Sequence, residues 1–80
     1  MIWVQLYGAL SPHYAKYAGE EGRAPLAFGQ KRIRVQQILA KLNIPENVVS
    51  FVAINGVKRA TNTWATDGDK VDIFPVITGG

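Results

Sequence analysis

Hydrophobic residues recur with a period of two near both ends of this 80-residue chain, and with a helical period only in its middle. Alternation over residues 2–8 and again over residues 71–75 is typical of strands that bury one face. The middle carries the i, i+3, i+4, i+7 apolar stripe of an amphipathic helix, formed by Val35, Ile38, Leu39 and Leu42. Because one helix covers one face of a small sheet, the pattern predicts an α+β fold.

The predicted helix has a well-marked end and a poorly marked start. We expect it to run from Ile33 to near Asn43, because asparagine tolerates the left-handed conformation that ends helices and Pro45 cannot continue one. No Ser, Thr, Asp or Asn stands directly before Ile33 to accept the first free backbone N–H groups. The cap is therefore expected to be Gln30, a water molecule or a tertiary contact.

Turn signals divide the remaining sequence into short strands. A strand over residues 25–29 is predicted to lead through a turn at residues 29–32 into the helix. Residues 48–55 are rich in β-branched and aromatic side chains and end in Asn55-Gly56, a strong hairpin signal because both residues tolerate positive φ. The chain is then predicted to return along residues 57–59.

Asp67, Asp69 and Asp72 are the closest group of carboxylates in the sequence. Paired carboxylates can act as acid and base when burial separates their pKa values. However, Gly68 lies between the first two, which favours a turn before the last strand over a catalytic pair.

A helix that crosses between strands allows the first and last strands to lie side by side and parallel in the middle of the sheet. This is the ubiquitin-like β-grasp arrangement, a mixed sheet of four to five strands with one main helix packed on one face. We expect residues 1–75 to form the globular domain. Residues 76–80 are expected to form an extended, flexible C-terminal tail that ends in Gly-Gly.

The residue types needed for catalysis are scarce. The chain contains no cysteine, which excludes disulfides, thiolate metal sites and a thiol nucleophile. Its single histidine, His13, lies two residues from Ser11 with no carboxylate to orient it, and one histidine cannot seed a zinc or iron site. No phosphate-binding glycine motif is present. We therefore expect neither a metal site nor a stand-alone enzyme.

The composition also bears on location and partners. No apolar segment reaches the roughly 18 residues that a membrane-spanning helix needs, and the first residues lack the pattern of a signal peptide. The protein is expected to stay in the cytoplasm without membrane contact. A formal net charge of +3 permits weak attraction to nucleic acid or to acidic proteins but identifies neither.

Two groups of side chains are candidates for a binding surface. Trp3, Tyr7 and Phe74 are expected to line one sheet face, either as a packed surface or as a docking patch. Trp64 is expected to close one end of the core. Five cations form either a solvated rim, which we favour, or a patch for phosphate groups or an acidic protein surface. They are Lys31, Arg32, Arg34, Lys58 and Arg59.

The end of the sequence carries several motifs in a fixed order. An Asp67-Gly68-Asp69 turn is followed by an apolar strand that ends in Phe74-Pro75, a short tail and a final Gly79-Gly80 pair. Together with the strand end at residues 52–56, this pattern resembles the ubiquitin-like sulfur carriers of the MoaD/ThiS family over nearly the whole chain.

The resemblance implies a chemistry for the last residue. In that family the carboxyl group of the final glycine, here Gly80, is adenylated by a separate MoeB/ThiF-like activating enzyme, which uses ATP and magnesium. It then becomes a thiocarboxylate that delivers sulfur to a second partner. The chain itself is expected to bind no cofactor and to serve as a sulfur-carrying substrate or as the small subunit of a partner enzyme.

The same resemblance implies which residues meet the partners. The tail is expected to thread into the partner through Val76, Ile77, Thr78 and Gly79, and its five residues reach about 17 Å when extended. The residues expected to dock on the partner are Phe74, Pro75, Trp3, Tyr7 and Arg59.

The family branch and the function class stay open. Val76 stands where the molybdopterin synthase small subunit usually has a second proline, whereas thiamine carriers usually lack Pro75. The long connection over residues 9–25 favours the molybdopterin branch, with the large subunit of molybdopterin synthase as acceptor and thiazole synthase as the alternative. The rival functions are a ubiquitin-like protein modifier and a β-grasp binding module whose basic patch binds protein or, less expectedly, nucleic acid.

Overall fold

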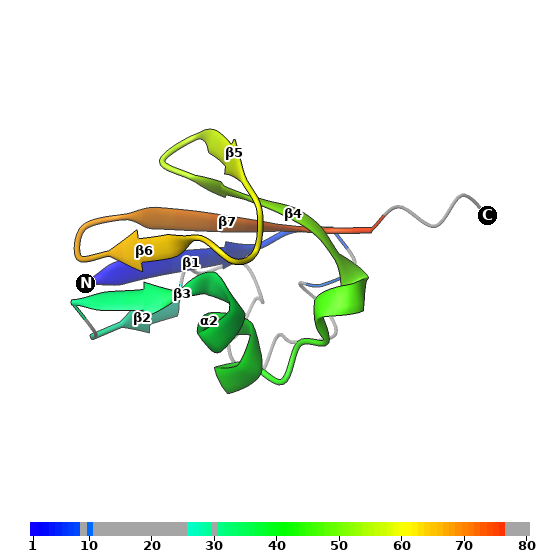
Figure 1. Ribbon diagram of the computed structural model, residues 1–80, viewed down its shortest axis with the longest axis horizontal. Helices are drawn as coiled ribbons and strands as arrows, with labels where there is room; N and C mark the ends of the chain where they lie inside the picture. The colour runs from blue at the N-terminus through cyan, green and yellow to red at the C-terminus, as the bar shows by residue number, and fades with distance from the viewer. Residues whose placement is uncertain (9, 11–25, 30, 77–80) are drawn as a thin grey trace.

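The computed structural model describes residues 1–8, 10, 26–29 and 31–76, which form an α+β arrangement around one helix (Figure 1). The predictions for Ser11, His13 and Gln30, and for residues 77–80, lie outside this part of the chain.

Five strands form the main sheet, in the order β2-β1-β7-β4-β5. The parallel pair at its centre consists of β1 and β7, and every other pair is antiparallel. The prediction that the first and last strands lie side by side and parallel is therefore confirmed. The strands are β1 (Ile2–Leu6), β2 (Leu26–Phe28), β4 (Val49–Ile54), β5 (Val57–Arg59) and β7 (Lys70–Pro75).

A second, two-stranded sheet was not predicted from the sequence. It pairs β3 (Arg32–Arg34) with β6 (Trp64–Thr66) in antiparallel register. The predicted helix start at Ile33 is therefore wrong, and Arg32 lies in a strand rather than in the predicted turn at residues 29–32. Ile33 lies in a strand opposite Ala65, and both side chains are buried.

The helix α2 (Val35–Lys41) begins two residues later than predicted. Its N-cap is Arg34, whose backbone N–H donates to Gln37 Oε1 at 3.0 Å. The predicted end is confirmed, because Asn43 has a φ of 57° and the chain leaves the helical path there. A short 3₁₀ helix, η2 (Glu46–Val48), then leads into β4.

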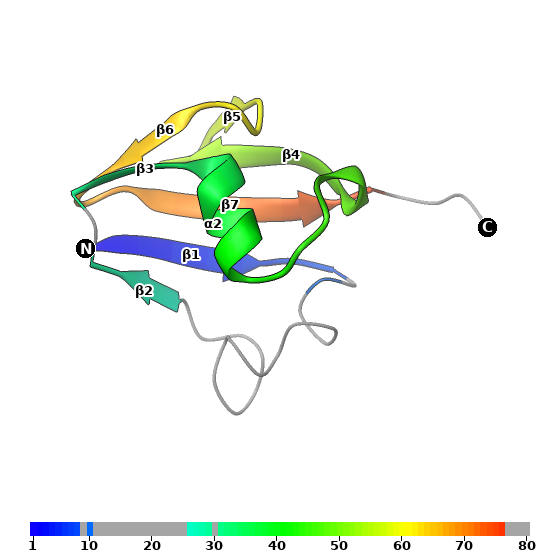
Figure 2. The same ribbon diagram turned by 60° about the horizontal axis from the view of Figure 1, so that its bottom comes forward.

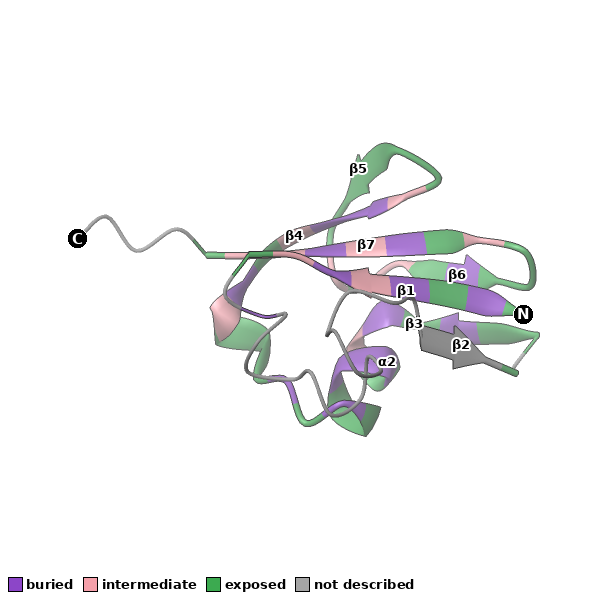
Figure 3. Cartoon of the chain, turned by 180° about the vertical axis from the view of Figure 1, so that it is seen from behind, coloured by how far each residue is buried: buried purple, intermediate pink, exposed green. Residues whose placement is uncertain are grey.

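The core lies between α2 and one face of the main sheet, as Figure 2 shows with the helix in front of β1 and β7. All four residues of the predicted helical stripe are buried. The sheet contributes Ile2, Val4, Leu6, Val52, Val71 and Ile73. Along β1 and β7, buried residues alternate with exposed or partly exposed ones, and no described element covers the second face of the sheet, which we call the open face (Figure 3).

Trp64 does not close the core as predicted. Its side chain is 37% exposed on β6, and the neighbouring Ala65 occupies the buried position instead. Side chains alternate between the two sides of a strand, so the central Ala65 of β6 faces inward and its neighbour Trp64 faces out.

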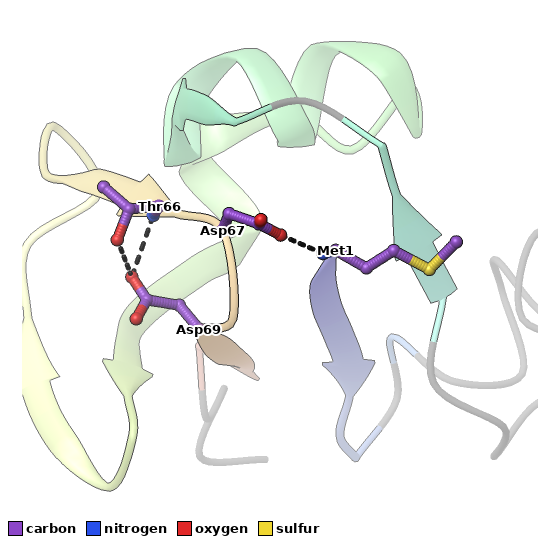
Figure 4. A network of polar contacts seen from close by, with 4 residues as sticks. All are labelled: Met1, Thr66, Asp67 and Asp69. Carbon is purple, nitrogen blue, oxygen red and sulfur yellow. Dashed lines mark hydrogen bonds and ion pairs between the residues drawn. The ribbon is translucent and has the colours of Figure 1, made fainter.

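Two predicted turns are present. Asn55 and Gly56 have φ values of 52° and 85°, the conformation that a two-residue hairpin between β4 and β5 requires. The Asp67–Asp69 segment forms the turn between β6 and β7. The carboxylate of Asp69 accepts hydrogen bonds from the Thr66 backbone N–H at 2.8 Å and hydroxyl at 3.1 Å (Figure 4).

Candidate interaction site on the open sheet face

Three stacked aromatic rings lie on the open face of the main sheet, near the carboxyl end of β7. Leu6 and Ile73 are register partners that face the core, so Tyr7 and Phe74, one residue further along, face the other way. The rings of Tyr7 and Phe74 stack with centroids 4.7 Å apart and an interplanar angle of 13°. Phe51 also stacks on Phe74, with centroids 4.7 Å apart and an interplanar angle of 19°.

The regular register of β4 with β7 places Phe51 in this stack, because Phe51 pairs with Phe74 directly after Val52 pairs with Ile73, and an irregularity follows. Val49 pairs with Pro75, but Phe51, two residues on, pairs with Phe74, only one residue back along β7. One extra residue of β4 is therefore accommodated between these pairs, as in a β-bulge. Beyond the bulge, Val52 faces the core opposite Ile73, which leaves Phe51 on the open face.

A lysine completes the cluster. Lys58 pairs with Ala53 on the open side of β5, and its Nζ lies 4.8 Å from the Phe51 ring centroid, within the range of a cation–π contact. Arg59 pairs with the buried Val52 and therefore lies on the other side of the same strand. We call Tyr7, Phe51, Lys58 and Phe74 the aromatic cluster.

A carboxylate borders the aromatic cluster. The Tyr7 hydroxyl donates to Asp72 Oδ1 at 3.2 Å, and Lys70 Nζ lies 3.9 Å from the same oxygen. Burial raises the pKa of Tyr7, and the charge of Asp72 and its hydrogen bond raise this pKa further.

The structure brings together only part of the predicted docking set. Tyr7 and Phe74 are in direct contact, whereas Trp3, 44% exposed, pairs with Lys70 at the far end of β1. Four residues along a strand separate Trp3 from Tyr7 by about 13 Å. Arg59 lies on the opposite side of β5, so Lys58 is the cation that joins the aromatic residues.

The chain leaves the sheet directly beside the aromatic cluster. Pro75 is the last residue of β7, and a Cβ added to Gly8 would lie 2.8 Å from Pro75 Cγ, so the proline ring packs against bare backbone. The Val76 backbone N–H donates to the Val48 carbonyl oxygen at 2.9 Å. These contacts fix the point from which the following residues extend. Of the predicted tail, Ile77, Thr78, Gly79 and Gly80 lie outside the described residues.

The aspartates of the last turn have structural partners. Asp67 pairs with the amino group of Met1 (Figure 4). Asp69 accepts a hydrogen bond from Asn55 Nδ2 at 2.9 Å. The hydrogen bond from the Thr66 backbone N–H is the main cause that holds the pKa of Asp69 below its ordinary value. Within the described ranges, no three His, Cys, Asp or Glu side chains are close enough to hold a metal ion.

Phe51 was missed in the sequence, and Lys58 was predicted only as part of a basic patch and not beside the aromatic residues, although a signal for both existed. Once Asn55-Gly56 fixes the hairpin register, alternation back from Ile54 places Val52 inward and Phe51 outward. Alternation forward from Val57 places Lys58 on that same outer side. What the sequence did not reveal is the register of β4 against β7, which brings Phe51 level with Phe74.

Comparison with known proteins found no protein-family model that matches this chain and no curated protein that is similar to it in sequence. Among the helices in the described part of the chain, none is long and apolar enough to cross a membrane.

Proposed function

We propose that the chain is a ubiquitin-like sulfur carrier of the β-grasp class, whose final glycine carries the sulfur as a thiocarboxylate. The fold assignment is supported by the strand order, by the parallel β1–β7 pair and by the helix α2, which packs on one sheet face between β2 and β4. The chemistry is supported by the Val-Ile-Thr-Gly-Gly sequence that follows β7.

The observation that carries the proposal is the position of the end of β7. This strand lies at the centre of the sheet, and its last residue adjoins the aromatic cluster on the open face. A partner that covers the aromatic cluster would therefore lie beside the start of the tail. Docking of the folded part and entry of the tail into a partner's active site are then geometrically compatible.

The proposed reaction takes place at the carboxylate of Gly80. A carboxylate oxygen attacks the α-phosphate of ATP and releases pyrophosphate, and a sulfur donor then replaces AMP at the acyl carbon. Glycine suits both steps because it has no Cβ to hinder approach to the carbonyl group. The chain acts here as a substrate, and a MoeB/ThiF-like activating enzyme in the cytoplasm supplies the catalytic groups, ATP and magnesium.

The proposed acceptor is the large subunit of molybdopterin synthase, with thiazole synthase as the second choice. The long connection over residues 9–25 and the presence of Pro75 favour the first acceptor. Val76 does not, because the small subunit of molybdopterin synthase usually has a second proline at this position. In either complex, the aromatic cluster and Pro75 would form the docking surface and residues 76–80 would enter the acceptor.

Intact-mass spectrometry of the untagged full-length protein tests the proposal. The protein is incubated with an activating enzyme from the same cell, ATP, magnesium and a sulfur donor, beside a variant that lacks Gly79 and Gly80. The mass of the starting protein first establishes whether Gly80 carries the free carboxyl group. Replacement of one carboxyl oxygen by sulfur should then add about 16 mass units to the full-length protein alone.

Each outcome is informative. A gain in mass that is lost on incubation with an acceptor supports a sulfur carrier. A full-length chain that instead becomes joined to lysine amines through Gly80 supports a protein modifier. If neither the thiocarboxylate nor the adenylate forms with an enzyme that activates its own known carrier, the proposal is wrong.

A further inference from the structure

Two arginines and a tryptophan form a second surface cluster, on the small sheet rather than on the open face. Arg34 pairs with Trp64 across β3 and β6, and Arg32 lies two residues before Arg34, on the same side of its strand. The Cζ atoms of Arg32 and Arg34 lie 4.0 and 4.4 Å from the Trp64 ring centroid. Ile33 and Ala65 are buried behind them.

The two guanidinium groups are held in place. Each one stacks on the indole ring, and Arg34 Nη1 also donates to the carbonyl oxygen of Asn62 at 3.0 Å. An arginine whose plane is already fixed loses less conformational entropy when it binds a ligand. The remaining N–H groups of both arginines are therefore prepared for an acceptor.

The positive charge of the arginine–tryptophan cluster is not neutralised within the described part of the chain. The ion pairs found there join Met1 to Asp67 and Lys70 to Asp72, and neither includes Arg32 or Arg34. The exposed Lys31 directly precedes the cluster and adds a third positive charge. Among the described residues, an anion at this place would gain attraction without displacing a carboxylate.

We propose that the arginine–tryptophan cluster binds a carboxylate-rich segment of a partner protein. The planar fork of a guanidinium group matches the two oxygens of a carboxylate, and two such groups beside one ring suit acidic side chains close together in sequence. Nucleic acid fits less well, because base stacking needs a free aromatic face and Trp64 already carries two guanidinium groups. This surface is separate from the tail and does not depend on the sulfur-carrier proposal.

The test is an NMR titration of the isotope-labelled full-length protein with a short polyglutamate peptide. The Trp64 indole N–H and the arginine side-chain N–H signals report binding at the cluster. Removing both charges with Arg32→Gln and Arg34→Gln should weaken binding about 3- to 10-fold, the range expected for two exposed charged contacts. The charge-conserving pair Arg32→Lys and Arg34→Lys should weaken it about 2- to 3-fold, because lysine lacks the planar fork.

The matched control removes the same charge elsewhere, with Lys41→Gln on α2 and Arg59→Gln on β5, and should change the affinity less than about 2-fold. An equal loss in this control would mean general charge attraction and would overturn the proposal. A titration that leaves the Trp64 signal in place would also overturn it. So would tighter binding of an oligothymidylate of equal charge at the same cluster, which would indicate a nucleic-acid surface. The lysine pair keeps the test valid should the glutamine pair fail to fold.

Discussion

Asp69 is the residue that joins the last turn to the hairpin between β4 and β5. Its two carboxylate oxygens accept hydrogen bonds from Thr66 on one side and from Asn55 on the other. In Asp69→Asn an amide N–H₂ group must face one of these donors. We expect the free energy of unfolding at pH 7 to fall by about 1 kcal/mol, a value that allows for the solvent exposure of the site. Urea denaturation measures the change.

The pH dependence of this effect follows from the lowered pKa of Asp69. A depressed folded-state pKa stabilises the fold above the unfolded value of about 3.9, and this stabilisation is lost as the pH falls through the folded-state pKa. The difference between wild type and Asp69→Asn should therefore be constant near neutrality and shrink in acid. Glu46→Gln removes an exposed carboxylate and should change stability by less than about 0.5 kcal/mol. A difference for Asp69→Asn that persisted unchanged in acid would contradict the assignment.

Gly8 controls the position of Pro75 and hence the start of the tail. Its φ is 56°, and an added Cβ would lie 2.8 Å from Pro75 Cγ. Gly8→Ala should therefore cost about 2–3 kcal/mol of stability, through backbone strain and collision together. Gly56→Ala has positive φ but open space around it, so it should cost about 1 kcal/mol less. Thermal unfolding compares them, with Gly29→Ala as a neutral control, and equal losses at Gly8 and Gly56 would exclude the collision.

The elements that the sequence predicted well are those with several regularly spaced apolar residues. The helical stripe and the alternation in β1 and β7 repeat often enough to identify element and buried face. The β3–β6 ladder was not predicted because each of its strands has only one buried residue, Ile33 or Ala65, which is too few to show alternation. In addition, Arg32-Ile33-Arg34 directly precedes the helical stripe and was interpreted as part of the turn and helix. Trp64 was predicted to be in the core because large apolar side chains are usually buried. In the structure its ring instead contacts the guanidinium groups of Arg32 and Arg34 at the surface.

The candidate site could be predicted only in part for a related reason. Alternation places Tyr7 and Phe74 on the open face, and the parallel pairing of β1 with β7 then makes them neighbours. The third ring depends on the register of β4 against β7, which pairs Phe51 with Phe74 and which no local sequence signal marks. Since a shift of one residue reverses the face of every side chain, this register has to be observed before such a site can be assembled.

Tyr7, directly after β1, is hydrogen-bonded to Asp72 on β7. This contact predicts how the pKa of Tyr7 changes when Asp72 is replaced. Burial is the largest cause of the raised pKa of Tyr7, followed by Asp72, so Asp72→Asn should lower this pKa part of the way toward the ordinary value of about 10. Tyrosinate absorbance, taken as the difference from Tyr7→Phe, measures it. Because the folded-state pKa is raised, the stabilising effect is complete below about pH 10 and is lost as the pH rises through the folded-state pKa. Asp67→Asn, in the β6–β7 turn, should leave the titration unchanged.

The whole molecule presents three separate features: the aromatic cluster, the chain end after β7 and the arginine–tryptophan cluster. If the proposed function is right, docking and chemistry are divided between the first two. The aromatic cluster is held by the fold and stays intact when the last two residues are removed, since its contacts come from β4, β5 and β7 and from Tyr7.

This division predicts that the chain without Gly79 and Gly80 competes with the full-length protein for the activating enzyme although it cannot react. Its inhibition constant should lie within about 3-fold of the KM of the full-length chain, since most docking energy would come from a few buried aromatic contacts. Phe51→Ala in the truncated chain should raise that constant about 10-fold, the effect of losing one such contact. Trp3→Ala, on the same face but at the far end of β1, should have a smaller effect. Unfolding measurements verify that both variants are folded. A truncated chain that does not compete would place recognition in the tail itself, and the aromatic cluster would then have another role.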